Sequence, residues 1–324
     1  MDFRSVSRQR TRLMGFAMLW VVYFHMTIRQ NPGALVYFIH RIGYYGVDLF
    51  LLVSGMGLWR SLSKNDAVLP FYGRRALRIF PAYAIVLCVW YAFRRVSPGA
   101  FALSLSTVGY WLQLEHFDWF IPTLIVYYLF APLVYRAVRR SGDSLLPVAV
   151  AFVLSAVLCV IGYFANLLGL YGSFVRIPVF VLGFWFGAQS DKDEPRKIGG
   201  WKICLAIIAG LAAAFIANRE RFGNVVQAGL NAYPALICMP AMALLLGAGF
   251  DRIDKHWGRF GKIVTAPFAF FGKYSLEIYL LHGSMMQLFP QWGQKAALLV
   301  SFLLAFVLHE AIALVLKACK RPGN

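Results

Sequence analysis

The chain has 324 residues, of which 60% are hydrophobic and only 14% are charged, with a formal net charge of +18. Soluble domains carry about a quarter charged residues, so this composition excludes an ordinary soluble protein. Apolar runs of about 20 residues recur along the whole sequence, which is typical of a helical membrane protein. No hydrophilic block is large enough for a second domain, so residues 1–324 are expected to form a single integral-membrane domain.

The apolar runs predict an all-α bundle of about ten transmembrane helices. The predicted spans are 13–31, 36–59, 76–93, 119–138, 146–166, 174–190, 201–218, 229–250, 264–284 and 296–317. Lys and Arg are concentrated on every second connection, which by the positive-inside rule places both termini in the cytoplasm. A further span over the Ser- and Gly-containing stretch 99–114 would destroy this bias, so that stretch is expected at the outer interface. The basic connections face anionic lipid headgroups, and no nucleic-acid partner is needed to explain the positive charge.

Two ionisable residues lie inside the first two predicted spans. His25 is about 18 Å along the first span at about 1.5 Å per residue, and Asp48 is close to the middle of the second. Ionisable groups inside a bilayer are costly and usually face a protein-lined cavity. Because the two depths overlap, we expect a catalytic His25–Asp48 pair in which the carboxylate orients the imidazole. The structural alternative is a buried histidine that bonds to a backbone carbonyl.

Three arginines stand at the predicted cytoplasmic start of the third span. Arg74 and Arg78 share a helical face, as do Arg75 and Arg78. Arginine makes bidentate contacts with phosphate, so this cluster suits an anionic, nucleotide-bearing ligand. Membership of a general positive belt is the alternative. In the preceding span, Ser54 and Gly55 are small enough to line a ligand channel or to let helices pack closely.

A polar group lies in the ninth predicted span. Lys273 and Glu277 are one turn apart and are expected to neutralise each other. Ser275 and His282 fall two turns apart on one face, with Tyr279 near it. The candidates for substrate binding in this span are Ser275, Glu277, Tyr279 and His282.

The predicted outer loop before the fourth span mixes acidic and aromatic residues. Glu115, His116 and Trp119 suit sugar binding, although Trp119 also suits an interfacial aromatic belt. The cysteines are scattered without metal-ligand spacing, so no metal site is predicted.

Five sequence strings, in this order, resemble the acyltransferase-3 family of integral-membrane O-acyltransferases over nearly the full chain. They are VVYFH ending at His25, GVDLFLLVSG at 46–55, FYGRRALRIFPAY at 71–83, DWFIPTLIVYYLFAPL at 118–133 and YSLEIYLLHG at 274–283.

The resemblance implies an enzyme of the bacterial inner membrane. It implies transfer of an acyl group, usually acetyl, from cytoplasmic acyl-CoA to a hydroxyl of a cell-surface or lipid-linked carbohydrate. Acyl-CoA is then a donor substrate, and no tightly bound cofactor is expected. His25 matches the essential histidine of the family, and FYGRRALR contains its arginine motif, which is proposed to hold the donor. Many members have Arg or Lys eleven positions before the histidine, where this chain has Met14; Arg12 is the nearest basic residue.

These elements combine into a mechanism. The CoA phosphates are expected to dock on the arginines, and the pantetheine arm is expected to pass Ser54 and Gly55. His25 then acts as general base or accepts the acyl group transiently. The competing hypothesis is a proton-coupled transporter that uses His25, Asp48 and Glu277 as a relay. A transporter has no evident need for three arginines at one helix entrance.

Overall fold

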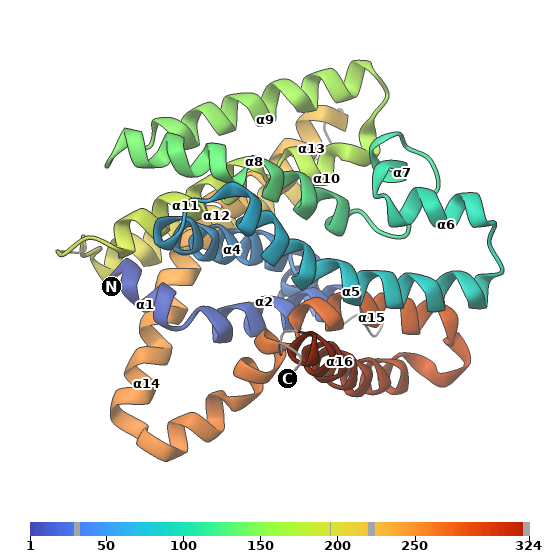
Figure 1. Ribbon diagram of the computed structural model, residues 1–324. Coiled ribbons are helices and arrows are strands. Elements are labelled where there is room, and N and C mark those ends of the chain that lie inside the picture. The colour runs from blue at the N-terminus through green and yellow to red at the C-terminus, as the bar shows by residue number, and fades with distance from the viewer. Residues whose placement is uncertain (29–32, 195, 220–223, 320–324) are drawn as a thin grey trace.

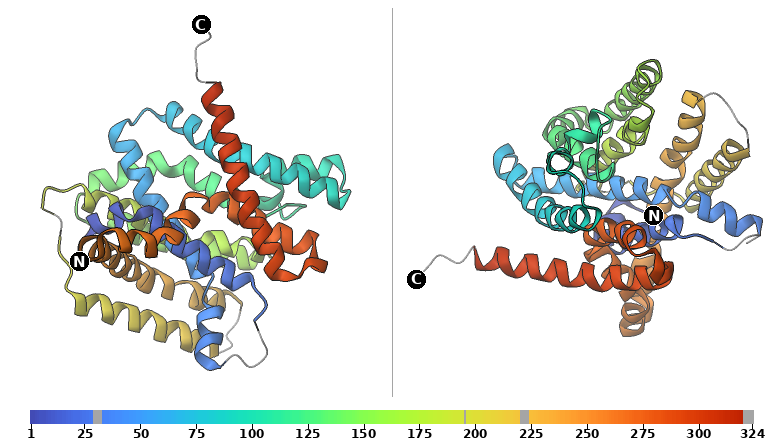
Figure 2. Two further views of the ribbon diagram at one scale, coloured as in Figure 1. Left: turned by 90° about the horizontal axis from the view of Figure 1, so that it is seen from below. Right: turned by 90° about the vertical axis from the view of Figure 1, so that its right-hand side faces the viewer.

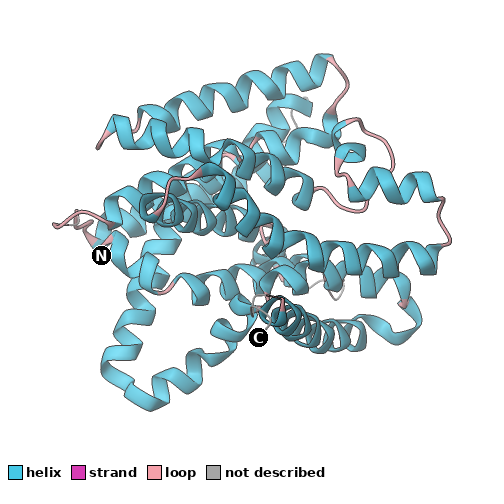
Figure 3. Ribbon diagram, in the orientation of Figure 1, coloured by secondary structure: helices cyan, strands magenta, loops and turns pink. Residues whose placement is uncertain are grey.

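The computed structural model describes residues 1–28, 33–194, 196–219 and 224–319. Throughout these ranges the regular elements are helices, and no strand is present (Figure 3). The predicted all-α class is therefore confirmed. The end of the predicted first span, residues 29–31, lies outside the described residues.

The helices are named as in Figure 1. Their bounds are α1 Phe3–Arg8, α2 Arg10–His25, α3 Ala34–Arg41, α4 Tyr45–Lys64, α5 Val68–Arg94, α6 Pro98–Leu105, α7 Val108–Trp111, α8 Phe120–Ser141, α9 Leu146–Phe164, η1 Leu168–Leu170, α10 Tyr171–Phe174, α11 Ile177–Ser190, α12 Gly200–Arg219, α13 Asn224–Ala232, α14 Pro234–Lys273, α15 Ser275–Leu288, η2 Pro290–Trp292 and α16 Gly293–Ala318.

Seven segments of the described chain are long and apolar enough to cross a membrane. They are Val68–Arg94, Phe120–Ser141, Leu146–Phe164, Leu168–Ser190, Gly200–Ala217, Gly229–Lys273 and Pro290–Ala318. An eighth is formed if α3 and α4, which are bent by 43° at the break between them, count as one span. The predicted number of ten spans is not confirmed.

The number of spans differs from the prediction because some apolar runs are broken into shorter helices and others are joined into one. The first run gives α2, which has only 16 residues, and the predicted span 264–284 is divided at Tyr274, which leaves α15 with 14 residues. Helix α14 instead continues for 40 residues with a kink at Gly258, whose φ is 49°. The stretch 99–114 forms α6 and α7, and neither of these short helices can cross a bilayer.

Close backbone contacts hold the central helices α2, α4, α11 and α14 together. A Cβ atom on Gly55 of α4 would lie 2.6 Å from the carbonyl oxygen of Phe180 and 3.0 Å from Cα of Gly183, both in α11. In the same way, Gly15 of α2 packs against the backbone of α14 at Phe268. Small residues permit such approaches, which maximise van der Waals packing where there is no water to drive association. The result is a rigid frame around α2, while α16 lies along one side and extends beyond the other helices (Figure 2).

Candidate functional site

Helix α2 connects the two ends of the candidate site. It begins at Arg10, on which the charge of Arg75 in α5 acts, and it ends at His25. We call these the arginine end and the histidine end. Asp48 lies in the first turn of α4, so both predicted catalytic residues stand at helix ends and not in the middle of continuous spans.

The structure does not bring His25 and Asp48 together. The Asp48 carboxylate is 3% exposed and lies 3.5 Å from Nε of Arg176, which directly precedes α11 and is 5% exposed. Arg176 also donates from Nη1 to the carbonyl of Gly172 at 2.7 Å, and its guanidinium stacks on the ring of Trp119 at 5.1 Å. Asp48 therefore neutralises a buried arginine under the loop that carries Trp119.

His25 instead meets His282 of α15. Nε2 of His282 lies 3.4 Å from Nδ1 of His25, and the two rings are 4.9 Å apart with their planes at 71°. His25 also bonds through Nδ1 to the carbonyl of Val21 at 2.8 Å. The His25 ring is exposed, whereas His282 is only 3% exposed. Among the described residues, the polar contacts of His25 are therefore made through Nδ1, and none involves Nε2.

A cavity in the middle of the bundle lies beside α2 between the two ends, along Met14, Met18 and Val21. It has an empty volume of about 680 Å³ and is lined mainly by apolar side chains of α2, α4, α5, α8 and α15. Arg78 and Ser54 line it near the arginine end, and the Ser54 hydroxyl lies 3.3 Å from the hydroxyl of Tyr128. Val21 and Tyr279 line it as well, and the carbonyls of these two residues bond to His25 and His282. The cavity therefore reaches within one helical turn of the histidine pair.

A second pocket lies between α5 and α16 and shares Arg78 with the central cavity. Arg78 donates from Nη1 to Glu277 at 2.6 Å, and Nδ1 of His309 is 3.0 Å from the same carboxylate oxygen. Glu277 is 1% exposed. Lys273 is paired with Glu310 at 2.6 Å, so the expected Lys273–Glu277 pair is not formed. The Arg78–Glu277 pair consequently stands between the pocket and the cavity.

Arg10 is an unexpected member of the arginine end. Its guanidinium occupies a notch in α4, because a Cβ on Gly57 would lie 3.0 Å from Cζ of Arg10. The positive charges of Arg75 and Arg60 act on it. Within the described residues, neither Arg10 nor Arg75 has an acidic partner. Such a group of like charges favours a bound anion.

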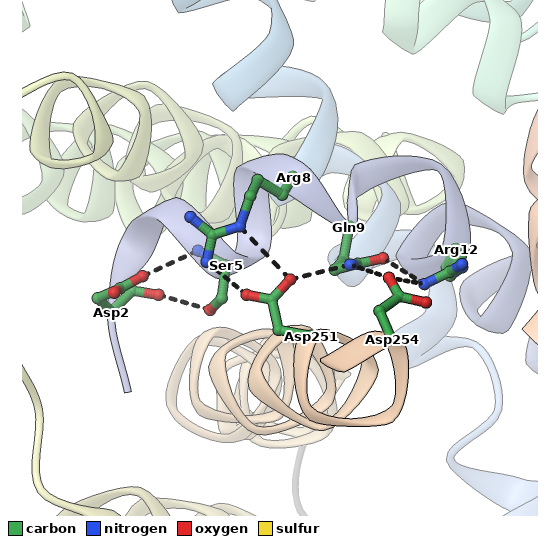
Figure 4. A network of polar contacts seen from close by, with 7 residues as sticks. All are labelled: Asp2, Ser5, Arg8, Gln9, Arg12, Asp251 and Asp254. Atoms are coloured by element: carbon green, nitrogen blue, oxygen red, sulfur yellow. Dashed lines mark hydrogen bonds and ion pairs between the residues drawn. The ribbon is translucent and has the colours of Figure 1, made fainter. Parts of the chain in front are cut away.

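Arg12, the basic residue nearest to Met14, is engaged elsewhere. Its Nη1 donates to Asp254 of α14 at 2.6 Å and to Gln9 at 2.9 Å, in a network that continues through Asp251 (Figure 4). This network ties α1 and α2 to α14. Met14 itself lines the central cavity.

The remaining predicted residues fall into two groups. Ser275 and Tyr279 line the central cavity, as Ser54 does, but Gly55 packs against α11 and does not line it. The close helix contact, and not a ligand channel, explains that glycine. Glu115 and His116 are exposed in the loop between α7 and α8, near Trp119 in sequence.

Two residues at the site were not singled out by the sequence. Arg10 is one of several basic residues near the N-terminus, and Arg176 looks like an ordinary loop charge before an apolar helix. The sequence feature that bears on Arg10 is the small residue Gly57, which leaves room for its guanidinium. The contact between the two residues could be found only from the packing of α2 against α4.

Comparisons with known proteins place the chain in a family. A family model described as "Acyltransferase domain", that of the acyltransferase-3 family, matches residues 13–317. A protein of Acidianus two-tailed virus that carries the name "Putative acetyltransferase ORF330" is 31% identical over 144 residues, which are 39% of this chain and 40% of that protein. The chain therefore matches less than half of that relative's length. No solved structure matches the chain.

Proposed function

This chain belongs to the acyltransferase-3 family and is an acyltransferase, and from that premise we propose that it moves an acetyl group from acetyl-CoA to a carbohydrate hydroxyl across a bacterial inner membrane. The observation that carries the proposal is the central cavity, which is lined by Arg78 near the arginine end and by Val21 and Tyr279, the residues whose carbonyls bond to His25 and His282. CoA is highly charged and does not cross a bilayer, whereas its pantetheine arm is thin and uncharged. A route of this kind lets the charged part stay on one side.

The arginine end is the proposed donor site. We assign it to the cytoplasm because the basic connections favour that side and because acyl-CoA is made there. Arg10, Arg74 and Arg75 would hold the phosphates, since they have no acidic partner among the described residues. Arg78 is paired with Glu277, so its role would be to admit the pantetheine arm from the pocket beside α16 into the cavity.

The chemistry is proposed to occur at His25. The ring accepts the proton of the acceptor hydroxyl while the hydroxyl oxygen attacks the thioester carbonyl. The C–S bond breaks, the new C–O ester bond forms, and the CoA thiolate takes the proton from the imidazolium. Transfer through an acyl-histidine is the alternative sequence of the same steps.

The acceptor is proposed to bind at the histidine end. Trp119 is only partly buried, and Glu115 and His116 are exposed beside it in the sequence. A mixed aromatic and acidic surface suits the apolar faces and hydroxyls of a sugar. Arg176, which stacks on Trp119, fixes the position of that indole ring.

The test is transfer of labelled acetyl from acetyl-CoA by the purified protein in detergent. The variant His25→Ala is expected to lose transfer and to keep its elution profile and melting temperature. His256→Ala, which changes an exposed histidine of α14, is the matched control and should retain full activity. Undiminished transfer by His25→Ala would refute the proposed role of the cavity and its histidine.

A further inference from the structure

The protonation state of the His25–His282 pair follows from its hydrogen-bond partners. Nδ1 of His282 lies 3.0 Å from the carbonyl oxygen of Ile278 and 2.8 Å from that of Tyr279. Carbonyl oxygens only accept hydrogen bonds, so Nδ1 of His282 carries the hydrogen. In a neutral ring the other nitrogen, Nε2, then holds a lone pair, and Nε2 is the atom that faces His25.

The same reasoning fixes the tautomer of His25. Its Nδ1 has two neighbours, the Val21 carbonyl at 2.8 Å and Nε2 of His282 at 3.4 Å, and both are acceptors. Nδ1 of His25 therefore carries the hydrogen and donates it to them. The remaining nitrogen, Nε2 of His25, holds the lone pair, and it belongs to the exposed ring at the end of α2.

We propose that His282 is the positioning residue of this enzyme: together with the Val21 carbonyl it fixes the tautomer and ring orientation of His25, so that Nε2 of His25 is the atom that accepts the proton of the acceptor hydroxyl. This inference rests on the proposed function. It gives His282 the task that a carboxylate performs in many histidine-based sites, where loss of the correct tautomer abolishes most of the activity. Asp48 is not placed for that task, because its carboxylate faces Arg176.

A neutral partner has a chemical consequence. When Nε2 of His25 takes the hydroxyl proton, the Nδ1–H bond to His282 and Val21 persists, so the imidazolium keeps its orientation. No negative charge on His282 holds the proton, which favours its return to the departing CoA thiolate in the same cycle. His282 is buried although His25 is exposed, so water has little access to Nε2 of His282 and does not replace its contact with Nδ1 of His25.

The experiment compares two substitutions of His282. Gln places an amide oxygen where Nε2 stands and accepts the His25 hydrogen bond, whereas Ala removes the acceptor. His282→Ala is expected to lower kcat by about a hundredfold with an unchanged KM for acetyl-CoA, and His282→Gln is expected to recover at least about tenfold of that loss. An equal loss in both variants, or a kcat of His282→Ala equal to that of the native protein, would overturn the proposal.

A spectroscopic readout is independent of turnover. In the protein labelled with ¹⁵N in its histidine rings, the His25 signals are assigned by their disappearance in His25→Ala. They should show a protonated Nδ1 and an unprotonated Nε2 in the native protein. In His282→Ala, where the Val21 carbonyl alone accepts from Nδ1, the share of the tautomer protonated at Nε2 should rise. A protonated Nε2 in the native protein would overturn the inference. Absence of acetyl transfer with the predicted tautomer present would instead count against the proposed function alone.

Discussion

The buried pair Asp48–Arg176 gives the sharpest prediction about stability. The two side chains are 3% and 5% exposed, and the charged atoms are 3.5 Å apart. At an effective dielectric constant of about 20, such a pair is attracted by about 5 kcal/mol. Removal of one partner leaves the other charge buried and unpaired, which costs about 3–5 kcal/mol. Asp48→Leu should therefore lower the free energy of unfolding by about 3–5 kcal/mol and Tm by about 6–10 °C.

The double variant separates a neutralising role from an orienting one. Replacing both charges with apolar residues removes the desolvation cost as well as the attraction, so Asp48→Leu with Arg176→Met should recover most of the lost stability. Because His25 is held by Val21 and His282, the double variant should also keep the His25-dependent transfer of acetyl from acetyl-CoA to water that is expected when no acceptor is bound. The assay is thermal unfolding in detergent, followed by release of free thiol from acetyl-CoA. An unchanged Tm in the single variant would refute this reasoning. So would a double variant that regains its Tm but releases no thiol from acetyl-CoA.

Three further outcomes are expected at the arginine end. Gly57→Val should displace the Arg10 guanidinium and raise the KM for acetyl-CoA about tenfold, a change of about 1.4 kcal/mol. An unaltered KM in titrations with acetyl-CoA would contradict the role of Arg10. Glu277→Gln weakens the bonds from Arg78 and His309 and should lower the free energy of unfolding by about 1–3 kcal/mol, measured by thermal unfolding. Arg75→Ala should raise the KM with little change in kcat, because the ground state and the transition state share the phosphate contact; a fall in kcat alone would argue against it.

The sequence predicted what is encoded locally. The arginine cluster, the apolar character of the helices and the candidates His25 and His282 can all be recognised from short strings. The depth of His25 and Asp48 was less predictable, because that arithmetic assumes unbroken spans. The chain leaves the helix after His25 and enters α4 only at Tyr45, which moves both residues to helix ends.

The contacts between side chains on different helices could not be predicted from the sequence, for a different reason. Whether Asp48 contacts His25 or Arg176 depends on the rotation of α4 about its axis and on the position of the segment before α11. The pattern of apolar residues determines neither of these. The same holds for Glu277, whose partners Arg78 and His309 come from α5 and α16. Family resemblance located the residues, but only the packing assigned them to one another.

Two arginines of α2, Arg10 and Arg12, differ in whether a carboxylate neutralises them, and this difference indicates different roles. Arg12 is neutralised by Asp254 and serves to fix α2 against α14, whereas Arg10, one turn of helix removed from Met14, is left without a carboxylate among the described residues. Met14 lines the cavity, so the interior wall near the arginine end is apolar where the uncharged part of a donor would pass. With Arg10, Arg74 and Arg75 free of acidic partners among the described residues, the proposed donor site would attract a polyanion to its entrance, and the neutral arm would pass beyond Arg78.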